Sequence, residues 1–235
     1  MKRVVTIVFA GLVFIQAVPA FSEPFFYKDV ERRMAAKEFD EAESLLGIYL
    51  SLNDKDVTAL SMLGRLYQEM GNRKRAAQYL NKAIKVNPGY PPAHFFLGKS
   101  YYMDMKDKEA ASELAVFREK MGLVTGMSGE DRAFYITMLD ETSEIYYNLK
   151  MLDDFYEVNQ SILKVSPDDQ VAVYNMGVYY YVNDHNNSKA YQAFNKAVAL
   201  SPGSELANKA KYAIEFMRAN PDSRMAPDFD FIDKL

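Results

Sequence analysis

The stretch that decides the fold is VTALSMLGRLYQEMGNRKRAAQYLNKAIKVNPGY, residues 57–90. Its glycine, Gly64, has a counterpart at Gly98, an offset of 34 in the numbering, inside the same frame of neighbours. The other pairs that keep this offset are Leu63 and Leu97, Tyr67 and Tyr101, Ala76 and Ala110, and Leu80 and Leu114. A fixed period of this length predicts a repeated two-helix unit, because one compact core would not impose it.

The period continues toward the N-terminus in weaker form. Ala42 and Leu46 precede Ala76 and Leu80 by the same offset. Small and apolar residues at matching positions suit the buried face of a second helix. We therefore expect residues 23–56 to form a degenerate first unit.

The period also continues toward the C-terminus, with one irregularity. Tyr146 and Tyr180 keep the offset, whereas Pro167 and Pro202 are separated by one position more. The last unit must therefore contain one extra residue. We place it in a loop at Asn183–Asn187, where polar residues cluster.

The unit at 57–90 resembles a tetratricopeptide repeat (TPR), a pair of antiparallel helices closed by a proline. The residues that carry the resemblance are Leu60, Leu63, Gly64, Tyr67, Gly71, Ala76, Leu80, Ala83 and Pro88. The next unit keeps most of them but has Phe117 where this one has Ala83. The resemblance implies an all-α, right-handed TPR-type helical solenoid of about five two-helix repeats plus a C-terminal capping helix.

The repeated glycines and tyrosines are expected to pack helices together. A glycine inside a helix costs about 1 kcal/mol relative to alanine, so its recurrence indicates close approach of a neighbouring helix. Small alanines on the second helix should meet that contact. The positions assigned to packing are Leu63, Gly64, Tyr67, Ala76, Pro88, Leu97, Gly98, Tyr101, Ala110, Tyr146, Pro167, Gly177, Tyr180, Ala190 and Pro202.

The chain divides into six expected parts. They are a signal peptide (1–20), repeats 1–3 (21–121), a glycine-rich insertion (122–129), repeats 4–5 (130–203), a capping helix (204–220) and an acidic, aromatic, flexible tail (221–235). The insertion could join two stacked halves or let them move, and we favour the first because repeat stacks usually continue across irregular joints. The tail could fray or could dock in a groove.

Composition indicates a globular chain with an anionic surface. Apolar residues make up 49% and charged residues 26%, with a net charge of −4. This balance argues against nucleic acid as a partner, which would favour a basic stripe. The basic run Arg73–Lys74–Arg75 is expected to be a solvated turn. Cysteine is absent, so disulfides and thiolate chemistry are excluded.

The first twenty residues are typical of a secretory signal peptide. Lys2 and Arg3 precede an apolar run that ends at Val18–Pro19–Ala20. We expect cleavage after Ala20, and an exported protein of the periplasm or cell envelope if the source is bacterial. The alternative is an uncleaved membrane anchor, although the run is short for the roughly 20 residues that span a bilayer.

A binding surface is expected on the first helices of successive repeats, because TPR domains hold peptides on that concave side. The predicted partner-binding residues are Tyr27, Ser61, Arg65, Gln68, Phe95, Lys99, Tyr102, Glu144, Tyr147, Tyr174 and Tyr181. Tyrosine and arginine dominate binding hot spots. Some of these tyrosines could instead pack between helices. The lysines and asparagines of the chaperone-tail clamp found in some TPR domains are not matched.

Catalysis is not expected, and neither a cofactor nor a metal is predicted. His94 and His185 are the only histidines and lie far apart in the sequence. The acids Asp140, Glu141 and Glu144 share one side of a helix, which favours a solvated or peptide-binding surface over a catalytic pair. We expect an exported adaptor that binds a protein or peptide and supports assembly, secretion or transport. The alternatives are a self-associating scaffold and a non-catalytic accessory subunit of an envelope enzyme.

Overall fold

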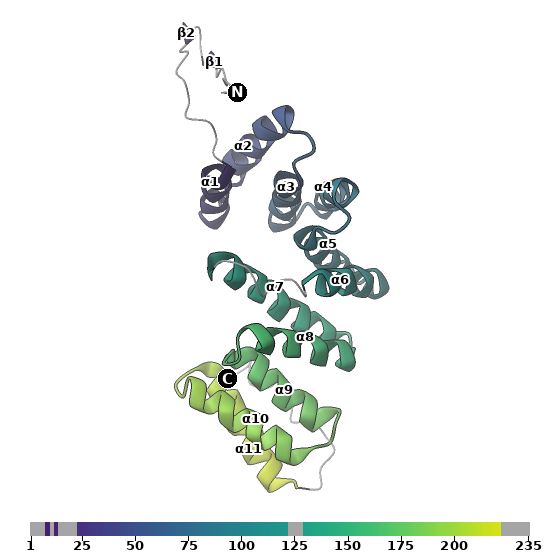
Figure 1. Ribbon diagram of the computed structural model, residues 1–235, viewed down its shortest axis with the longest axis vertical. Coiled ribbons are helices and arrows are strands. Elements are labelled where there is room, and N and C mark those ends of the chain that lie inside the picture. The colour runs from purple at the N-terminus through teal and green to yellow at the C-terminus, as the bar shows by residue number, and fades with distance from the viewer. Residues whose placement is uncertain (1–7, 10–11, 14–22, 122–128, 222–235) are drawn as a thin grey trace. The chain divides into compact units, whose positions relative to one another are not determined.

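The protein, seen in a computed structural model, is described over residues 8–9, 12–13, 23–121 and 129–221 (Figure 1). Two compact units divide between Ser100 and Tyr101. Unit 1 contains β1 (Val8–Phe9), β2 (Leu12–Val13), α1 (Glu23–Ala35), α2 (Phe39–Leu52), α3 (Val57–Glu69), α4 (Arg73–Val86) and most of α5 (Pro91–Met103). Unit 2 contains the end of α5, α6 (Asp107–Met121), α7 (Gly129–Asn148), α8 (Leu152–Val165), α9 (Gln170–Val182), α10 (Asn187–Leu200) and α11 (Glu205–Ala219).

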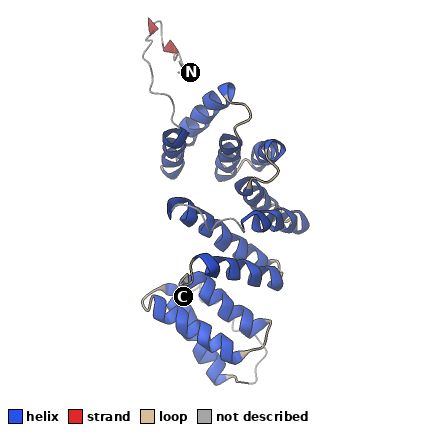
Figure 2. Cartoon of the chain, viewed as in Figure 1, coloured by secondary structure: helices blue, strands red, loops and turns tan. Residues whose placement is uncertain are grey.

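Apart from β1 and β2, a two-residue antiparallel pair, the described residues are helical or lie in turns and loops (Figure 2). The all-α fold predicted from the period is therefore confirmed. The division between units falls inside the third expected repeat, earlier than the glycine-rich segment 122–129. Residues 122–128 of that segment lie outside the described chain.

The hairpin α3–α4 shows why the glycine recurs. A Cβ on Gly64 would lie only 2.6 Å from Leu80 Cγ, so any larger residue would push α4 away. Gly177 has the same relation to Phe194 in unit 2, at 2.7 Å from its Cδ1. The predicted close approach is confirmed at Gly64 and Gly177, but its partner is not the alanine. Ala76 and Ala190 are buried one turn earlier, and the large side chain that follows fills the gap.

In the fourth repeat, polar side chains form the contact that a glycine and a large apolar side chain form in the second and fifth repeats. Ser143 stands where Gly64 and Gly177 stand in their repeats, counted back from the tyrosine three residues later. Asn159 on α8 donates to the Ser143 hydroxyl oxygen at 2.6 Å, and both side chains are fully buried. Asn175 on α9 donates to Asn159 Oδ1 at 3.0 Å. This buried network joins α7, α8 and α9, and it accounts for the serine that replaces the repeat glycine in α7.

The turn inside each hairpin contains one residue in the left-handed conformation. In the second repeat, Gly71 N donates to Gln68 O and Asn72 N donates to Tyr67 O, a Schellman motif that ends α3. Among the described residues, those that are left-handed, with φ between 49° and 77°, are the five residues Lys37, Gly71, Met105, Lys150 and His185. Consecutive left-handed residues are 34, 34, 45 and 35 positions apart in the sequence. The left-handed residues thus mark five hairpins.

These steps locate the irregularities of the chain. The third step is longer than the first two because of an insertion between the third and fourth turns. Part of it lies in α7, which has 20 residues against 13 in α3. In the last hairpin Asn186 N reaches back six residues to Tyr180 O, where the other turns span five. The extra residue predicted in the loop Asn183–Asn187 is therefore confirmed.

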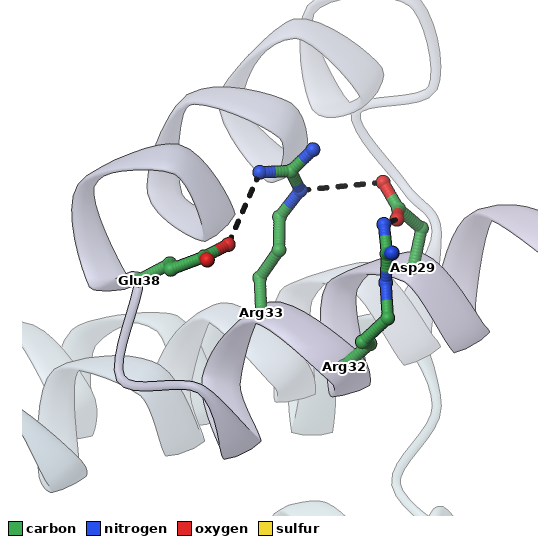
Figure 3. A network of polar contacts seen from close by, with 4 residues as sticks. All are labelled: Asp29, Arg32, Arg33 and Glu38. Carbon is green, nitrogen blue, oxygen red and sulfur yellow. Dashed lines mark hydrogen bonds and ion pairs between the residues drawn. The ribbon is translucent and has the colours of Figure 1, made fainter.

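The turn of the first hairpin, between α1 and α2, is held by ion pairs (Figure 3). Arg33 near the end of α1 contacts Asp29 Oδ2 at 3.3 Å through Nε and Glu38 Oε2 at 3.4 Å through Nη1. Arg32 contacts the other oxygen of Asp29. Glu38 immediately precedes α2, so Arg33 ties the end of one helix to the beginning of the next. Ion pairs near the surface contribute about 0.2–1 kcal/mol each.

The last helix, α11, closes unit 2 as predicted. The Ser204 hydroxyl accepts from Ala207 N at 3.0 Å and caps its N-terminus. Ala210, Ala213 and Met217 are buried in a cluster that includes Phe194 of α10. A helix that covers the final apolar face is what a repeat stack requires. Of the expected tail, only Pro221 lies within the described residues.

Candidate partner-binding face

The eleven residues predicted to bind a partner lie on the first helices of the hairpins, and within each unit we call the side that they define the first-helix face. The structure divides them by exposure. The buried members are Ser61, Gln68, Phe95, Tyr174 and Tyr181. The half-buried or exposed members are Tyr27, Arg65, Lys99, Tyr102, Glu144 and Tyr147. The buried side chains pack between helices, so only the second group offers surface to a partner.

Arg65 is the centre of the face in unit 1, and it is already engaged. Its guanidinium binds both carboxylate oxygens of Glu31 on α1, at 2.9 and 3.0 Å, and Glu69 of its own helix at 2.9 Å. Its Cζ also lies 5.7 Å from the ring centroid of Phe96 on α5. Arg65 thus links three first helices. A carboxylate ligand would have to displace Glu31 or Glu69 to reach it.

Tyr27 belongs to an aromatic cluster at the α1–α2 end of unit 1. Its ring meets that of Tyr49 edge-on at 6.1 Å, and Tyr49 donates its hydroxyl to Asp56 at 3.1 Å. Burial, together with hydrogen bonds to Tyr49 and Asp56, raises the pKa of the Tyr27 phenol far above its usual range. Asp56 also caps α3 by accepting from Ala59 N at 2.9 Å. Tyr27 is therefore a neutral group that helps to hold this cap in place.

The face in unit 2 carries a different chemistry. Tyr102 accepts a hydrogen bond from Asn148 Nδ2 at 3.1 Å, which joins α5 to the end of α7. Tyr147, one residue earlier on α7, packs its ring at 5.4 Å from Phe155 and has Lys150 at 5.0 Å from its centroid. Two tyrosines from different helices are thus held in defined positions on the face to which the exposed Glu144 also belongs.

Asp140 on α7 is the most unusual group on this face. It stands at the repeat position that Ser61, Phe95 and Tyr174 occupy elsewhere, but it is a carboxyl. Burial, and after it the negative charges of Asp169 and Glu141, raises the pKa of Asp140 to about 7. Its buried oxygen Oδ1 has no hydrogen-bond partner among the described residues.

A carboxyl in this state is costly unless a ligand supplies a donor or a positive charge. The sequence places Asp140 near Glu141 and Glu144. It does not indicate that one of these three carboxylates would have a buried oxygen. That depends on the packing of α7 against its neighbours. Asp140 therefore joins the candidate face.

The two histidines and Asn175 have structural positions in the fold. His94 is buried, and its Nε2 lies 2.9 Å from the carbonyl oxygen of Pro88, so it is a packing residue. His185 is the left-handed residue of the last hairpin turn. Asn175 is bound within the buried network, with its Nδ2 at 3.3 Å from the Ser143 hydroxyl oxygen.

Within the described ranges, no three histidine, cysteine, aspartate or glutamate side chains are grouped so as to hold a metal ion. None of the described helices is long and apolar enough to cross a lipid bilayer.

Comparison with known proteins agrees with this arrangement. Residues 33–94 match the tetratricopeptide repeat family. No curated protein sequence matches the chain. Among solved structures, a crystal structure of MamA protein is 17% identical, covers 87% of this chain and 97% of its own, and superposes with a TM-score of 0.54.

Two other solved structures are also similar. YrrB, described as a TPR protein with an unusual peptide-binding site, is 21% identical over 80% of this chain and 90% of its own, with a TM-score of 0.55. The Pseudomonas aeruginosa protein PilF is 12% identical over 85% of this chain and 92% of its own, with a TM-score of 0.63. At these identities the likeness concerns the fold alone. The chain therefore has the fold of a TPR helical solenoid, and its residues 33–94 carry the sequence pattern of that repeat.

Proposed function

We propose that this chain is a protein-interaction adaptor, and that it binds a segment of another protein on the first-helix face of unit 2. The observation that carries the proposal is the half-buried Asp140 carboxyl, whose oxygen Oδ1 has no hydrogen-bond partner among the described residues. Glu144, Tyr147 and Tyr102 lie on the same face. Together they offer two acidic groups and two aromatic rings.

This chemistry favours a segment with a lysine or arginine beside an apolar residue. A basic side chain would place its positive charge beside the half-buried Asp140 carboxyl and stabilise its ionised form. Aromatic rings accept cations on their faces and also contact apolar side chains. The similarity to YrrB, which is described as having a peptide-binding site, supports peptides as the class of ligand. The role is one of binding, without a catalytic step or a cofactor.

An exported location is part of the proposal. It is supported by the basic start and apolar run of residues 1–20, which are typical of a signal peptide. Helix α1 begins at Glu23, three residues after the proposed cleavage point. In a bacterial source the adaptor would then work in the periplasm or cell envelope, in assembly, secretion or transport. Fractionation with N-terminal sequencing tests this: intact cytoplasmic protein would refute export.

The binding proposal is tested with a panel of labelled peptides that pair lysine or arginine with an apolar residue. Fluorescence anisotropy with wild-type protein should identify binders that Asp140→Asn weakens about tenfold or more, because the charge is lost and the shape is kept. Asp153→Asn, at an exposed carboxylate on α8, is the control. The proposal fails if no such peptide binds, or if both variants bind as the wild type does.

A further inference from the structure

We propose that two copies of this chain pair through the exposed sides of α2 and α4, so that α2 of each copy lies against α4 of the other. The surface lies on the second helices of the hairpins in unit 1 and is separate from the first-helix face. The inference therefore goes beyond the adaptor function and does not depend on it.

The exposed side of α2 is acidic at its beginning and apolar at its end. Asp40 and Glu41 are exposed and have no ion-pair partner among the described residues. Farther along, the large side chains of Ile48 and Leu52 are 54% and 64% exposed. The helix contains no lysine or arginine. An apolar pair one turn apart beside a charged first turn is a feature that a partner surface would cover.

The exposed side of α4 has the opposite charge. Lys74 and Lys85 are exposed and have no ion-pair partner among the described residues, and Val86 at the end of the helix is 42% exposed. No acid occurs anywhere in α4. Its first turn is Arg73–Lys74–Arg75, which places positive charge at the positive end of the helix dipole. That placement destabilises the helix in an isolated chain, and a negative partner would relieve it.

The two surfaces match position by position. When the two helices are aligned by the repeat offset, Asp40 corresponds to Lys74 and Leu52 corresponds to Val86. Equivalent positions in neighbouring repeats face nearly the same way. The ion pair of Glu43 with Arg75, at 3.7 Å, also brings the beginnings of α2 and α4 within reach of each other's long side chains. One chain therefore presents an acidic and a basic helix next to each other.

This geometry selects one symmetry. A two-fold axis parallel to the helices places α2 of one copy opposite α4 of the other, in the same direction and in register. Asp40 and Glu41 then meet the region of Lys74, and Leu52 meets Val86. Such an arrangement is a closed dimer in which the two contacts are identical.

The other two-fold arrangement lacks this complementarity. An axis across the helices would place α2 against α2 and α4 against α4, in opposite directions. The basic first turn of α4 would then meet Lys85 of the second copy, and Asp40 would meet the apolar Leu52. Like charges that face each other suppress association, so the parallel arrangement is favoured.

The apolar end of α2 can also be covered in the parallel arrangement. Ile48 lies at the level of Lys82, the residue one offset later. The methylene stem of a lysine can lie along an apolar side chain while its charge stays in water. The contact therefore combines charge at one end of the helices with apolar burial at the other.

The contact is small. Each helix has 14 residues and is about 21 Å long. Two helix pairs with faces about 10 Å wide bury on the order of 800 Å² in total, at the low end for a specific interface. We therefore expect a reversible dimer at micromolar concentrations that weakens when salt is added.

The experiment is sedimentation equilibrium of the purified protein from about 1 to 200 μM, at about 50 mM and about 500 mM salt, where the screening length falls to roughly 4 Å. The average mass should rise with concentration toward twice that of one chain at low salt, with about tenfold weaker association at high salt. A wild-type protein that stays monomeric across this range overturns the proposal.

Charge exchange makes the test specific. One variant is Arg73→Glu with Lys74→Glu, and the other is Asp40→Lys with Glu41→Lys. Each alone should associate at least tenfold more weakly than the wild type, because like charges now meet across the axis. An equimolar mixture should form a heterodimer, because acid again meets base in both contacts.

A matched control is Asp107→Lys with Asp153→Lys. These are exposed acids in the first turns of α6 and α8, second helices of hairpins in unit 2. The control should dimerise as the wild type does. Unchanged helical circular dichroism keeps the comparison valid for each variant. Association of either exchange variant alone at wild-type strength, or failure of their mixture to associate, overturns the proposal.

Discussion

Leu80 packs directly over the backbone of Gly64: a Cβ at residue 64 would lie 2.6 Å from Leu80 Cγ and 3.3 Å from its backbone nitrogen. The backbone of α4 thus approaches α3 so closely that only hydrogen fits at this position. Because Cγ lies near the backbone, Leu80 cannot move aside as the end of a long side chain could. The contact sets the distance between the two helices of the hairpin.

Gly64→Ala should therefore destabilise the protein, although alanine is the better helix former. We expect a loss of about 1–3 kcal/mol from overpacking, measured by urea denaturation followed by circular dichroism. Gly47 provides the control, because no atom lies within 4 Å of a Cβ at this position of α2. Gly47→Ala should stabilise the protein by roughly 0.5–1 kcal/mol. Equal effects of the two changes would show that close packing is not what Gly64 provides.

The buried network of the fourth repeat should behave as one unit. Asn159→Leu removes the donor to Ser143 and the acceptor for Asn175, and should cost about 2–4 kcal/mol. Adding Ser143→Gly recreates the pair seen at Gly64 and Leu80, and should recover part of the loss. A double-mutant cycle would measure a coupling of about 0.5–3 kcal/mol. Simple additivity of the two changes would contradict the network.

Asp140 should make stability depend on pH near neutrality. Its folded pKa of about 7 lies above the unfolded value of about 3.9, so folding favours the protonated carboxyl. The stabilising effect of protonation is complete below the unfolded pKa and is lost as pH rises through 7. The carboxyl is partly exposed, which reduces the effect, and we expect a loss of about 1–2 kcal/mol between pH 5 and pH 8.

Asp140→Asn should remove most of that pH dependence, and Asp153→Asn at an exposed site should leave it in place. Thermal melts at several pH values make the comparison. If the wild type and Asp140→Asn lose stability in parallel, another group is responsible.

Substitutions at the left-handed residues of two hairpin turns should change the stability of the protein in opposite directions. Met105 is left-handed at φ 56° and 89% exposed, so glycine would relieve the backbone cost without removing a contact. We expect Met105→Gly to stabilise the protein by about 0.5–1 kcal/mol. Gly71→Ala should cost about 1 kcal/mol, because a Cβ at φ 77° is unfavourable even though no atom crowds it. Denaturation midpoints would show both shifts, and a loss on Met105→Gly would contradict this account.

Periodicity in the sequence was sufficient to predict the hairpins, the extra residue near Asn183 and the capping helix after Ser204. Each of these depends on local pattern: small and aromatic residues at a constant offset, or a serine before an amphipathic run. The partner of the glycine was not predictable in the same way. Ala76 has the expected size, but the direction of the Leu80 side chain across the hairpin decides the contact.

Exposure on the first-helix face was harder to predict. The period places Tyr174 and Tyr181 on that side, yet both are buried in the cluster that α10 and α11 complete. A pattern in one helix does not reveal how far large side chains of its neighbours reach over it. For the same reason the half-buried carboxyl of Asp140 could not be distinguished from the solvated Glu144 before the helices were placed.

The left-handed residue in each turn has a consequence for how such chains are recognised. Only one of the five is a glycine, Gly71, and of the five only Lys37 and Gly71 lie inside the stretch 33–94 that matches the repeat family. At the other four turns the backbone keeps the shape while lysine, methionine or histidine occupies the site. In a chain of this kind the repeats can therefore be recognised from the backbone. A residue with positive φ marks each hairpin turn even where the amino acid at that position no longer matches the repeat pattern.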